Sequence, residues 1–277
     1  MCSSFAWYSK AAVYGMNFDC WDFPCRFRMV EGEEGLFSFD VELGGTWLET
    51  ASMNRHGLFA NFQGNISPRH RNVGPGPGVL PVAELYRGAL RSCATAGEVL
   101  ALIGDRTVAY APVPPETNML HNLFADARGG AFVLESSEGR NSVTPVAGRS
   151  LVMTNFPVDS LEGRIPAEGE DDPTRPGLDR YGSLARGLEA LGWPLRARDF
   201  LGLLERVVQE REWETLASMV FDPARARVYV CVKRDFSRIW CADLGAGRIA
   251  SGAGFAASAS FSLQGEGVSL AELAACR

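Results

Sequence analysis

Hydrophobic and polar residues alternate along several stretches of the chain, as they do in β-strands that are buried on one face. The first two stretches cover residues 3–9 and 12–18, and LFSFDVEL continues the alternation from Leu36. TWLETASMN and GLFANFQ follow, separated by the turn-like residues 55–57. The N-terminal part of the chain is therefore predicted to form β-strands joined by short turns.

Two pairs of segments have helical spacing of apolar residues instead. The first pair, 82–90 and 96–102, follows a stretch at 72–78 whose glycines and prolines predict a loop. The second pair is a helix over 180–191 and a helix that begins after Asp199, and an aspartate before each is its predicted N-cap.

Further strand-like stretches lie between the two helix pairs and after the second pair. They are residues 117–126, 129–136, 150–156, 215–222, 227–234, 237–244 and 253–263. Strands and helix pairs are thus segregated along the chain, which argues for packed layers with an antiparallel sheet and against a parallel βαβ fold. The acidic, Pro-rich segment 161–179 is predicted to be a long loop, and such loops are commonly functional or disordered.

The composition restricts the class of protein and its partners. The 277 residues are 46% hydrophobic and 22% charged, which is typical of a soluble globular protein, and we predict one domain over 1–277. A net charge of −6 without a basic run argues against a nucleic-acid partner. No signal peptide and no run of about 18 apolar residues is present, which predicts a cytoplasmic protein without a membrane partner. A homo-oligomer stays possible.

The seven cysteines do not indicate a metal site, because their number is odd and no pair has the spacing of a zinc site. Cys20 and Cys25 bracket the sequence WDFP, which is compatible with a disulfide or half of a metal site. Packed free thiols are the more common outcome, since free cysteine behaves mostly as a small hydrophobic residue. We predict no metal and no cofactor.

Cys2 is the cysteine with the clearest chemical potential. Removal of Met1, which normally occurs before a small residue, would leave Cys2 with a thiol and a free α-amine on one residue. The reference pKa of an α-amine is about 7.7–8.0, so this amine can serve as the base for the thiol. Pairing of the first two strands as a hairpin would bring Asp19 close enough to hold the amine. The alternative is a frayed chain end without function.

Seven short motifs occur in a fixed order along the chain. They are Met1-Cys2-Ser3, Gly15-Met16-Asn17-Phe18-Asp19, Met53-Asn54-Arg55-His56-Gly57-Leu58, AFVLE at 131–135, Met153-Thr154-Asn155-Phe156-Pro157, Asp179-Arg180-Tyr181 and TLASMVFDP at 215–223. Together they resemble the N-terminal cysteine nucleophile (Ntn) hydrolases of the choloylglycine hydrolase and penicillin acylase/acyltransferase type, which cleave linear amide C–N bonds. The resemblance implies an α+β fold, the four-layer αββα sandwich of two stacked antiparallel sheets.

The resemblance also implies roles for four residues. Cys2 would be the nucleophile, with its own α-amine as proton acceptor, and Asp19 would hold that amine. Asn155 would donate a hydrogen bond to the tetrahedral oxyanion. Arg180 would lie by the thiol and favour the thiolate, because adjacent cations lower a thiol pKa. A cation is not otherwise favoured at a helix N-terminus, which supports a functional reason for Arg180.

A second oxyanion donor is expected on the strand after Gly57. Strand alternation places Asn61, Gln63 and Asn65 on one face, and the sequence does not decide among them. Asn17, within the second motif, completes the expected substrate and oxyanion set.

Other polar residues of this part of the chain are predicted to be structural. Asn54 is expected in a turn, His56 on the surface, and His121 as a hydrogen-bonded histidine of the core.

Two positions depart from the family pattern. One is the polar residue after Gly57, often Asn in the family, whose place among Asn61, Gln63 and Asn65 stays open. The other is Met16, which stands where the family has an arginine. Arg26 or Arg28 could replace that charge. The resemblance therefore implies a hydrolase of small-molecule amides, with N-acyl amide, penicillin-type and bile-salt-type conjugates as candidates, that acts through a thioester acyl-enzyme. The alternatives are an acyltransferase that uses the same Cys2 acyl-enzyme, and a non-catalytic binder of small amides, which Met16 would favour.

Overall fold

The computed structural model of the chain describes all residues except 34, 67–72, 111–118, 138, 211–212 and 277. Two predicted segments begin outside this described part. They are the loop predicted at 72–78, by its first residue, and the strand predicted at 117–126, by its first two residues. Within it, no helix is both long and apolar enough to span a membrane.

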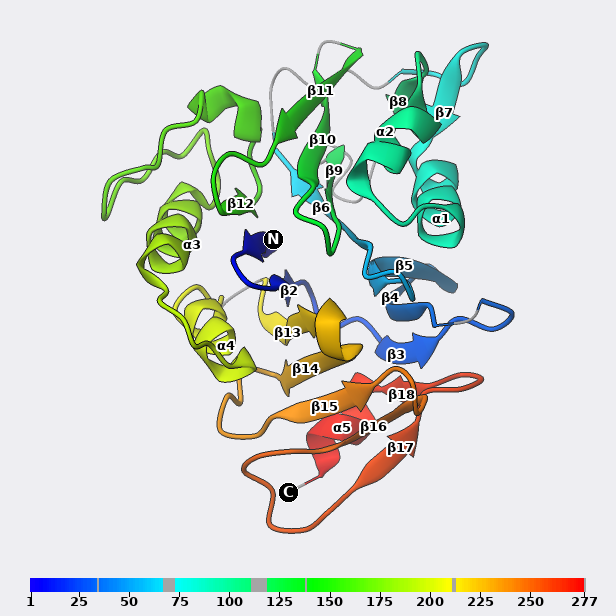
Figure 1. Ribbon diagram of the computed structural model, residues 1–277, viewed down its shortest axis with the longest axis vertical. Coiled ribbons are helices and arrows are strands. Elements are labelled where there is room, and N and C mark those ends of the chain that lie inside the picture. The colour runs from blue at the N-terminus through cyan, green and yellow to red at the C-terminus, as the bar shows by residue number, and fades with distance from the viewer. Residues whose placement is uncertain (34, 67–72, 111–118, 138, 211–212, 277) are drawn as a thin grey trace.

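The first of two large sheets contains the N-terminal hairpin and most C-terminal strands (Figure 1). In spatial order its strands are β12 (Ser150–Met153), β1 (Ser3–Tyr8), β2 (Ala12–Asp19), β13 (Thr215–Asp222), β14 (Arg227–Val232), β15 (Trp240–Asp243), β16 (Arg248–Ser251) and β17 (Ser260–Ser262), and neighbours are antiparallel. The predicted hairpin of β1 and β2 places Ser3 opposite Asn17, while β13 places Thr215 opposite Asp19. This register brings the end of β2 beside the N-terminus.

The second sheet is also antiparallel. In spatial order its strands are β11 (Arg140–Pro145), β10 (Ala131–Ser137), β9 (Met119–Ala125), β6 (Phe59–Asn65), β5 (Thr46–Met53), β4 (Phe37–Leu43), β3 (Cys25–Met29) and β18 (Val268–Ser269). A small parallel pair, β7 (Val79–Pro81) and β8 (Thr107–Ala109), lies outside both large sheets.

Three hydrophobic clusters hold the layers together. The cluster between the two sheets includes Phe39, Phe59 and Phe221. A second cluster packs β-strands of the second sheet against α1 (Val82–Ser92) and α2 (Ala96–Ile103), and a third packs the first sheet against α3 (Leu178–Ala190) and α4 (Ala197–Glu205). Figure 1 shows the two helix pairs on opposite sides of the sheets. The predicted αββα sandwich of the α+β class is therefore confirmed.

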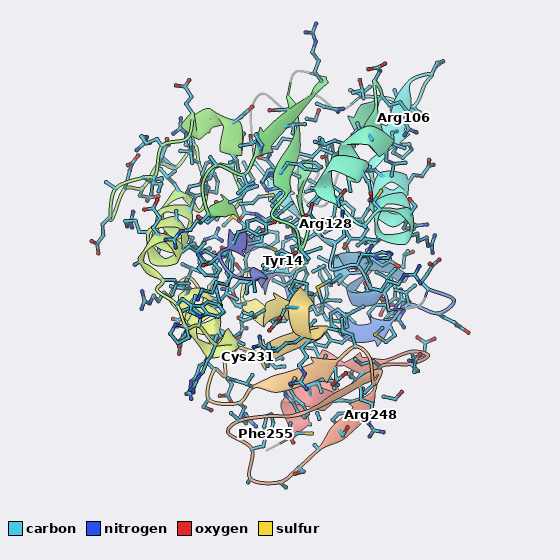
Figure 2. All side chains as sticks on the ribbon, viewed as in Figure 1. Tyr14, Arg106, Arg128, Cys231, Arg248 and Phe255 are labelled. Atoms are coloured by element: carbon cyan, nitrogen blue, oxygen red, sulfur yellow. The ribbon has the colours of Figure 1, made fainter. Side chains whose placement is uncertain are left out.

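Tyr14 shows how the two sheets are joined near the centre of the molecule (Figure 2). Its ring stacks on Phe59 with centroids 5.2 Å apart, and its hydroxyl donates to the Gly57 carbonyl at 3.0 Å. Gly57 has a φ of 77°, and a Cβ there would lie 2.7 Å from Pro223 Cβ, so only glycine fits this turn. Asn54 closes the same turn, as predicted, by accepting the His56 and Leu58 backbone N–H groups.

Both predicted N-caps of the second helix pair are wrong. α3 begins after Gly177, whose φ of 84° is left-handed, so Asp179 is already the second helical residue. α4 begins at Ala197, and Asp199 accepts the backbone N–H of Arg196 from inside the first turn. An aspartate in the first turn stabilises a helix start much as a cap does, and a sequence pattern does not separate the two.

The pairing of β5 with β6 is incomplete, and this matters for the site. The two strands pair only between Ala51–Met53 and Phe59–Asn61. Beyond these pairs, Thr46–Glu49 pair only with β4, after a register shift at Thr50, and Phe62–Asn65 pair only with β9. The second sheet is therefore split between the remaining halves of β5 and β6.

Candidate active site

Cys2 lies just before β1, with its side chain buried at the end of the inter-sheet core. Phe5 and Trp7 of the following strand pack in the cluster of α3 and α4, so alternation puts the thiol on the opposite face, toward the second sheet. The sulfur lies 3.8 Å from the Asp19 backbone carbonyl. Pairing of β1 with both β2 and β12 fixes this end of the chain, so Cys2 does not sit on a frayed terminus.

Asp19 ends β2 beside the first residues of the chain, with its carboxylate fully buried. Thr215 Oγ1 donates to Oδ1 at 2.6 Å, and Gln209 Nε2 donates to Oδ2 at 2.9 Å. Gln209 also donates to the Met1 carbonyl at 2.7 Å, while the Met1 ammonium donates to the Asp19 backbone carbonyl at 2.6 Å. The chain start is thus bound on several sides by groups around Asp19.

Arg180 reaches the same place from the third residue of α3, and its side chain is only 8% exposed. Nη1 donates to the Cys2 carbonyl at 2.9 Å and to the Ser3 hydroxyl, and lies 3.7 Å from Asp19 Oδ2. A Cβ on Gly177 would lie 2.4 Å from Nη2, so glycine at the helix start also makes room for the guanidinium. The charge that seemed misplaced on the helix is therefore directed at the N-terminus of the chain.

Asn155 follows β12 and completes the group. Its Oδ1 accepts Nη2 of Arg180 at 2.8 Å, and its Nδ2 donates to the Gly64 carbonyl at 2.6 Å. Because a guanidinium can only donate, Arg180 fixes which end of the carboxamide is the oxygen. The amide N–H₂ of Asn155 is thereby directed toward β6.

A cavity of about 460 Å³ opens beside these residues. Cys2, Asp19, Gln63, Gly64 and Asn155 form one polar end of its lining. The rest is mostly apolar and aromatic, with Phe18, Trp21, Trp47, Phe62, Tyr86 and Trp213, but it also includes the charged residues Arg28, Glu49 and Arg87. Because the lining combines the unpaired half of β5, the end of β6 and α1, the cavity passes through the split in the second sheet.

Burial also affects the protonation of the Cys2 sulfur. It raises the pKa of the Cys2 thiol, and the nearby N-terminal ammonium and Arg180 oppose this rise only in part. Burial likewise raises the pKa of Asp19, against the effects of Arg180, the ammonium and the two hydrogen bonds to its carboxylate. A thiol in this setting stays protonated at neutral pH and needs a base to become a nucleophile.

The structure brings together Cys2, Asp19, Asn155 and Arg180, but separates the remaining predicted site residues. Gln63 lines the cavity, with its Oε1 accepting from Ser4 at 3.2 Å. The other three are buried and do not line it. Asn17 donates to Leu204 of α4, Asn61 to the Met16 sulfur, and Asn65 to Glu135.

The charge missing at Met16 is not replaced at that place. Met16 is fully buried between the sheets, with its sulfur 3.4 Å from Asn61 Nδ2. Arg26 and Arg28 both bind Asp40 on the second sheet. Of these two, only Arg28 reaches the cavity lining, and among the described residues the cation that contacts Cys2 is Arg180.

Several residues of the site were not anticipated from the sequence. Thr215 could have been found by pairing β13 with β2, because that register puts it opposite Asp19. Gln209 lies in the segment between α4 and β13 and has no sequence signal. Gly64 and Gly177 are contacted by Asn155 and Thr154 through their carbonyls, a role that leaves no trace in a residue pattern.

No protein-family model matches the sequence, and no curated protein matches it. Solved structures do match. A cysteine-to-alanine mutant of the conjugated bile acid hydrolase of Clostridium perfringens has a TM-score of 0.67 at 14% identity, over 89% of this chain and 93% of that one. Penicillin V acylase from Agrobacterium tumefaciens has a TM-score of 0.63 at 16% identity, over 91% and 92% of the two chains.

A third structure is more distant. The Caenorhabditis elegans ortholog of N-acylethanolamine-hydrolyzing acid amidase has a TM-score of 0.53 at 16% identity, over 80% of this chain and 93% of that one. At these identities the likeness concerns the fold. The chain has the Ntn-hydrolase fold of the choloylglycine hydrolase type that its motifs indicate.

Proposed function

We propose that this chain is a cysteine-nucleophile hydrolase of linear amides, with Cys2 as nucleophile after removal of Met1. The observation that carries the proposal is the arrangement around the thiol. A buried thiol, a buried carboxylate, an arginine and an oriented carboxamide converge at the polar end of a largely apolar cavity. All three solved structures compared above carry the names of amide-cleaving enzymes.

Removal of Met1 turns the backbone nitrogen of Cys2 into an α-amine. The Met1 carbonyl now accepts from Gln209, whose amide also binds the Asp19 carboxylate, so the new amine would lie beside both. In the proposed arrangement Asp19 holds the amine, and the amine takes the thiol proton. This base is required because burial keeps the Cys2 thiol protonated.

The proposed reaction has two stages. In the first, the Cys2 sulfur bonds to the amide carbonyl carbon while the thiol proton moves to the α-amine, and Asn155 Nδ2 donates to the resulting oxyanion. The C–N bond then breaks, the leaving amine takes this proton from the Cys2 α-ammonium, and a thioester remains. In the second, water attacks the thioester and releases a carboxylic acid and the free thiol. Loss of one oxyanion donor typically costs about 10²–10³ in rate.

The cavity supports a substrate with a bulky apolar acyl group. Small-molecule sites commonly occupy about 300–1,000 Å³, and the cavity, with about 460 Å³, lies in this range. Cys2, Asp19 and Asn155 lie together in its lining, whereas the residues of β3, β5, β6 and α1 that line the passage are mainly apolar and aromatic, with Arg28, Glu49 and Arg87 as charged exceptions. We therefore place the scissile amide at Cys2 and the acyl group in the split of the second sheet.

The test uses the full chain with a panel of N-acyl amides of increasing acyl size, and mass detection of products. We expect an intact mass without Met1, release of free acid, and loss of all release in Cys2→Ala. Cys20→Ala is the matched control, because Cys20 lines the same cavity and should be dispensable. A retained Met1, or unchanged turnover in Cys2→Ala, contradicts the proposal. New amide formed from an added amine would instead assign acyl transfer.

A further inference from the structure

The segment that carries Asn155, Thr154–Asp159, is held by a buried polar network of the second sheet. The Thr154 carbonyl, directly before Asn155, accepts two hydrogen bonds. Gln63 Nε2 donates at 2.5 Å and His121 Nε2 at 2.7 Å. His121 belongs to β9 and is fully buried.

Glu135 of β10 holds the other end of the segment. Its Oε2 accepts the backbone N–H of Val158 at 3.0 Å, while its Oε1 lies 2.8 Å from His121 Nδ1 and accepts from Asn65 at 2.9 Å. Both ends of the segment are thus bound through one His–Glu pair. Asn155 lies between these two attachment points.

Three hydrogen bonds of this pair have a fixed direction. A carbonyl only accepts, so His121 Nε2 carries a proton toward Thr154. The N–H groups of Val158 and Asn65 donate to the carboxyl oxygens of Glu135. His121 Nδ1 lies against the same carboxyl group, and both side chains are shielded from solvent.

A buried polar pair is a costly way to fill a protein interior, because each polar group must find a hydrogen-bond partner there. Replacing both partners by apolar groups of the same shape can be nearly neutral or stabilising, so stability alone gives little reason for the pair. What the pair supplies here is directional bonding at both ends of one short segment. Electrostatic catalysis needs such fixed geometry, because an oxyanion donor works only if it is oriented before the reaction.

We propose that His121 and Glu135 are positioning residues that hold Asn155 in place as the oxyanion donor, an inference that rests on the proposed function. Neither residue lines the cavity, so they act through Thr154 and the segment and not on the substrate. The structural role predicted for His121 from the sequence is then also a functional one.

The test compares two reactions of the same thiol in His121→Leu, His121→Gln and Glu135→Gln. Amide hydrolysis needs the oxyanion donor, whereas alkylation of Cys2 by iodoacetamide does not. A misplacement of about 1 Å costs roughly 10²-fold in rate, so we expect kcat to fall about 10–100-fold in His121→Leu and Glu135→Gln, with KM and alkylation within twofold of the parent. His121→Gln keeps a donor for Thr154 and should recover part of kcat.

Asn122→Ala is the matched control for loss of a buried polar group on β9. Asn122 donates to the Asn61 carbonyl, away from the Thr154–Asp159 segment, so the variant should lose stability without loss of kcat. Thermal melting of every variant separates unfolding from mispositioning. If Asn122→Ala lowers kcat as much as His121→Leu at equal melting temperature, the positioning role is excluded.

A double variant separates this inference from the proposed function. If His121 acts through Asn155, His121→Leu combined with Asn155→Ala loses no more activity than Asn155→Ala alone. Additive losses would overturn the positioning role. Full activity in Asn155→Ala would instead overturn the oxyanion assignment on which the inference depends.

Discussion

Asp19 and Asp40 are two buried aspartates, each with arginine nearby, but their neutralisation differs. Asp40, on the outer face of the second sheet, binds Nε of both Arg26 and Arg28 and accepts the Ser38 hydroxyl at 2.6 Å. Among the described residues, the Asp19 carboxylate accepts hydrogen bonds from the neutral side chains of Thr215 and Gln209, and its guanidinium neighbour, Arg180, has Nη1 3.7 Å away.

The two carboxylates differ in how completely nearby cations neutralise them. Two direct guanidinium contacts leave Asp40 no need of another cation. Asp19 has a hydroxyl, an amide and a more distant arginine, so an ammonium beside it would be a favourable partner. The Met1 ammonium already lies at the Asp19 backbone carbonyl, and the Gln209 amide binds both the Met1 carbonyl and the Asp19 carboxylate, so a Cys2 amine would lie beside that carboxylate. Under the proposed function, it is therefore incomplete neutralisation, and not burial, that distinguishes Asp19 from Asp40.

The largest expected effect comes from the two isosteric variants Asp19→Asn and Asp40→Asn. Without its carboxylate, position 19 cannot hold the α-amine, and we expect kcat/KM to fall by about 10²–10⁴, the contribution typical of a positioned acid or base. Asp40→Asn should keep activity within about threefold. Its free energy of unfolding should fall by about 3 kcal/mol, since removal of one partner of a buried ion pair typically costs about 3–5 kcal/mol.

Turnover and urea unfolding of both variants check this contrast. Equal loss of turnover in the two variants would show that the comparison has no functional meaning. If both variants lose the same stability and only Asp19→Asn loses turnover, the contrast between the two aspartates is supported.

The parts of the site that could be predicted lie on local patterns. Alternation along residues 3–9 and 12–18 predicts the hairpin, and the hairpin brings Asp19 to the N-terminus. The roles of Asn155 and Arg180 came from the family resemblance, because nothing local links residues so far apart in the chain. Hydrophobic pattern alone predicts layers, but it does not identify which carboxylate a loop glutamine such as Gln209 will bind.

Other features depend on irregularities that periodicity does not report. CRFRM forms β3, although the sequence analysis predicts no strand there. Its alternating pattern is only five residues long and follows the Pro- and Trp-containing WDFP. The split between β5 and β6 begins where the pairing of β4 with β5 shifts register after Phe39, and a register is a property of two strands together. The cavity, which depends on this split, therefore could not be predicted from the sequence.

A smaller effect is expected from Arg180→Gln compared with Arg28→Gln. Burial raises the pKa of Cys2, and Arg180 is among the groups that lower it, so its loss raises that pKa further. A higher pKa means less thiolate at neutral pH. We expect alkylation of Cys2 at pH 7.5 to slow in Arg180→Gln and its pH midpoint to move upward. Arg28→Gln should leave both unchanged.

Mass mapping after iodoacetamide treatment measures the rate and pH dependence of alkylation at Cys2 separately from the other cysteines. Cys20 in the same cavity is an internal standard, because burial raises its pKa to about 12 and keeps it slow to react. An unchanged Cys2 profile in Arg180→Gln would show that the guanidinium only holds Asn155 and the backbone.

The smallest expected effect concerns one hydroxyl on each aspartate, in Thr215→Val and Ser38→Ala. Each hydroxyl donates to a buried carboxylate, so each variant should lose about 1.5–3 kcal/mol of stability, as hydrogen bonds to charged groups do. Only Thr215→Val should also change the pH profile. The Thr215 hydrogen bond lowers the pKa of Asp19, so its removal raises that pKa, which burial already raises. Because the ionised carboxylate is needed, activity is lost as pH falls through this pKa, and the acid limb of kcat/KM should move to higher pH. An acid limb that moves equally in Ser38→Ala would assign it to a group other than Asp19.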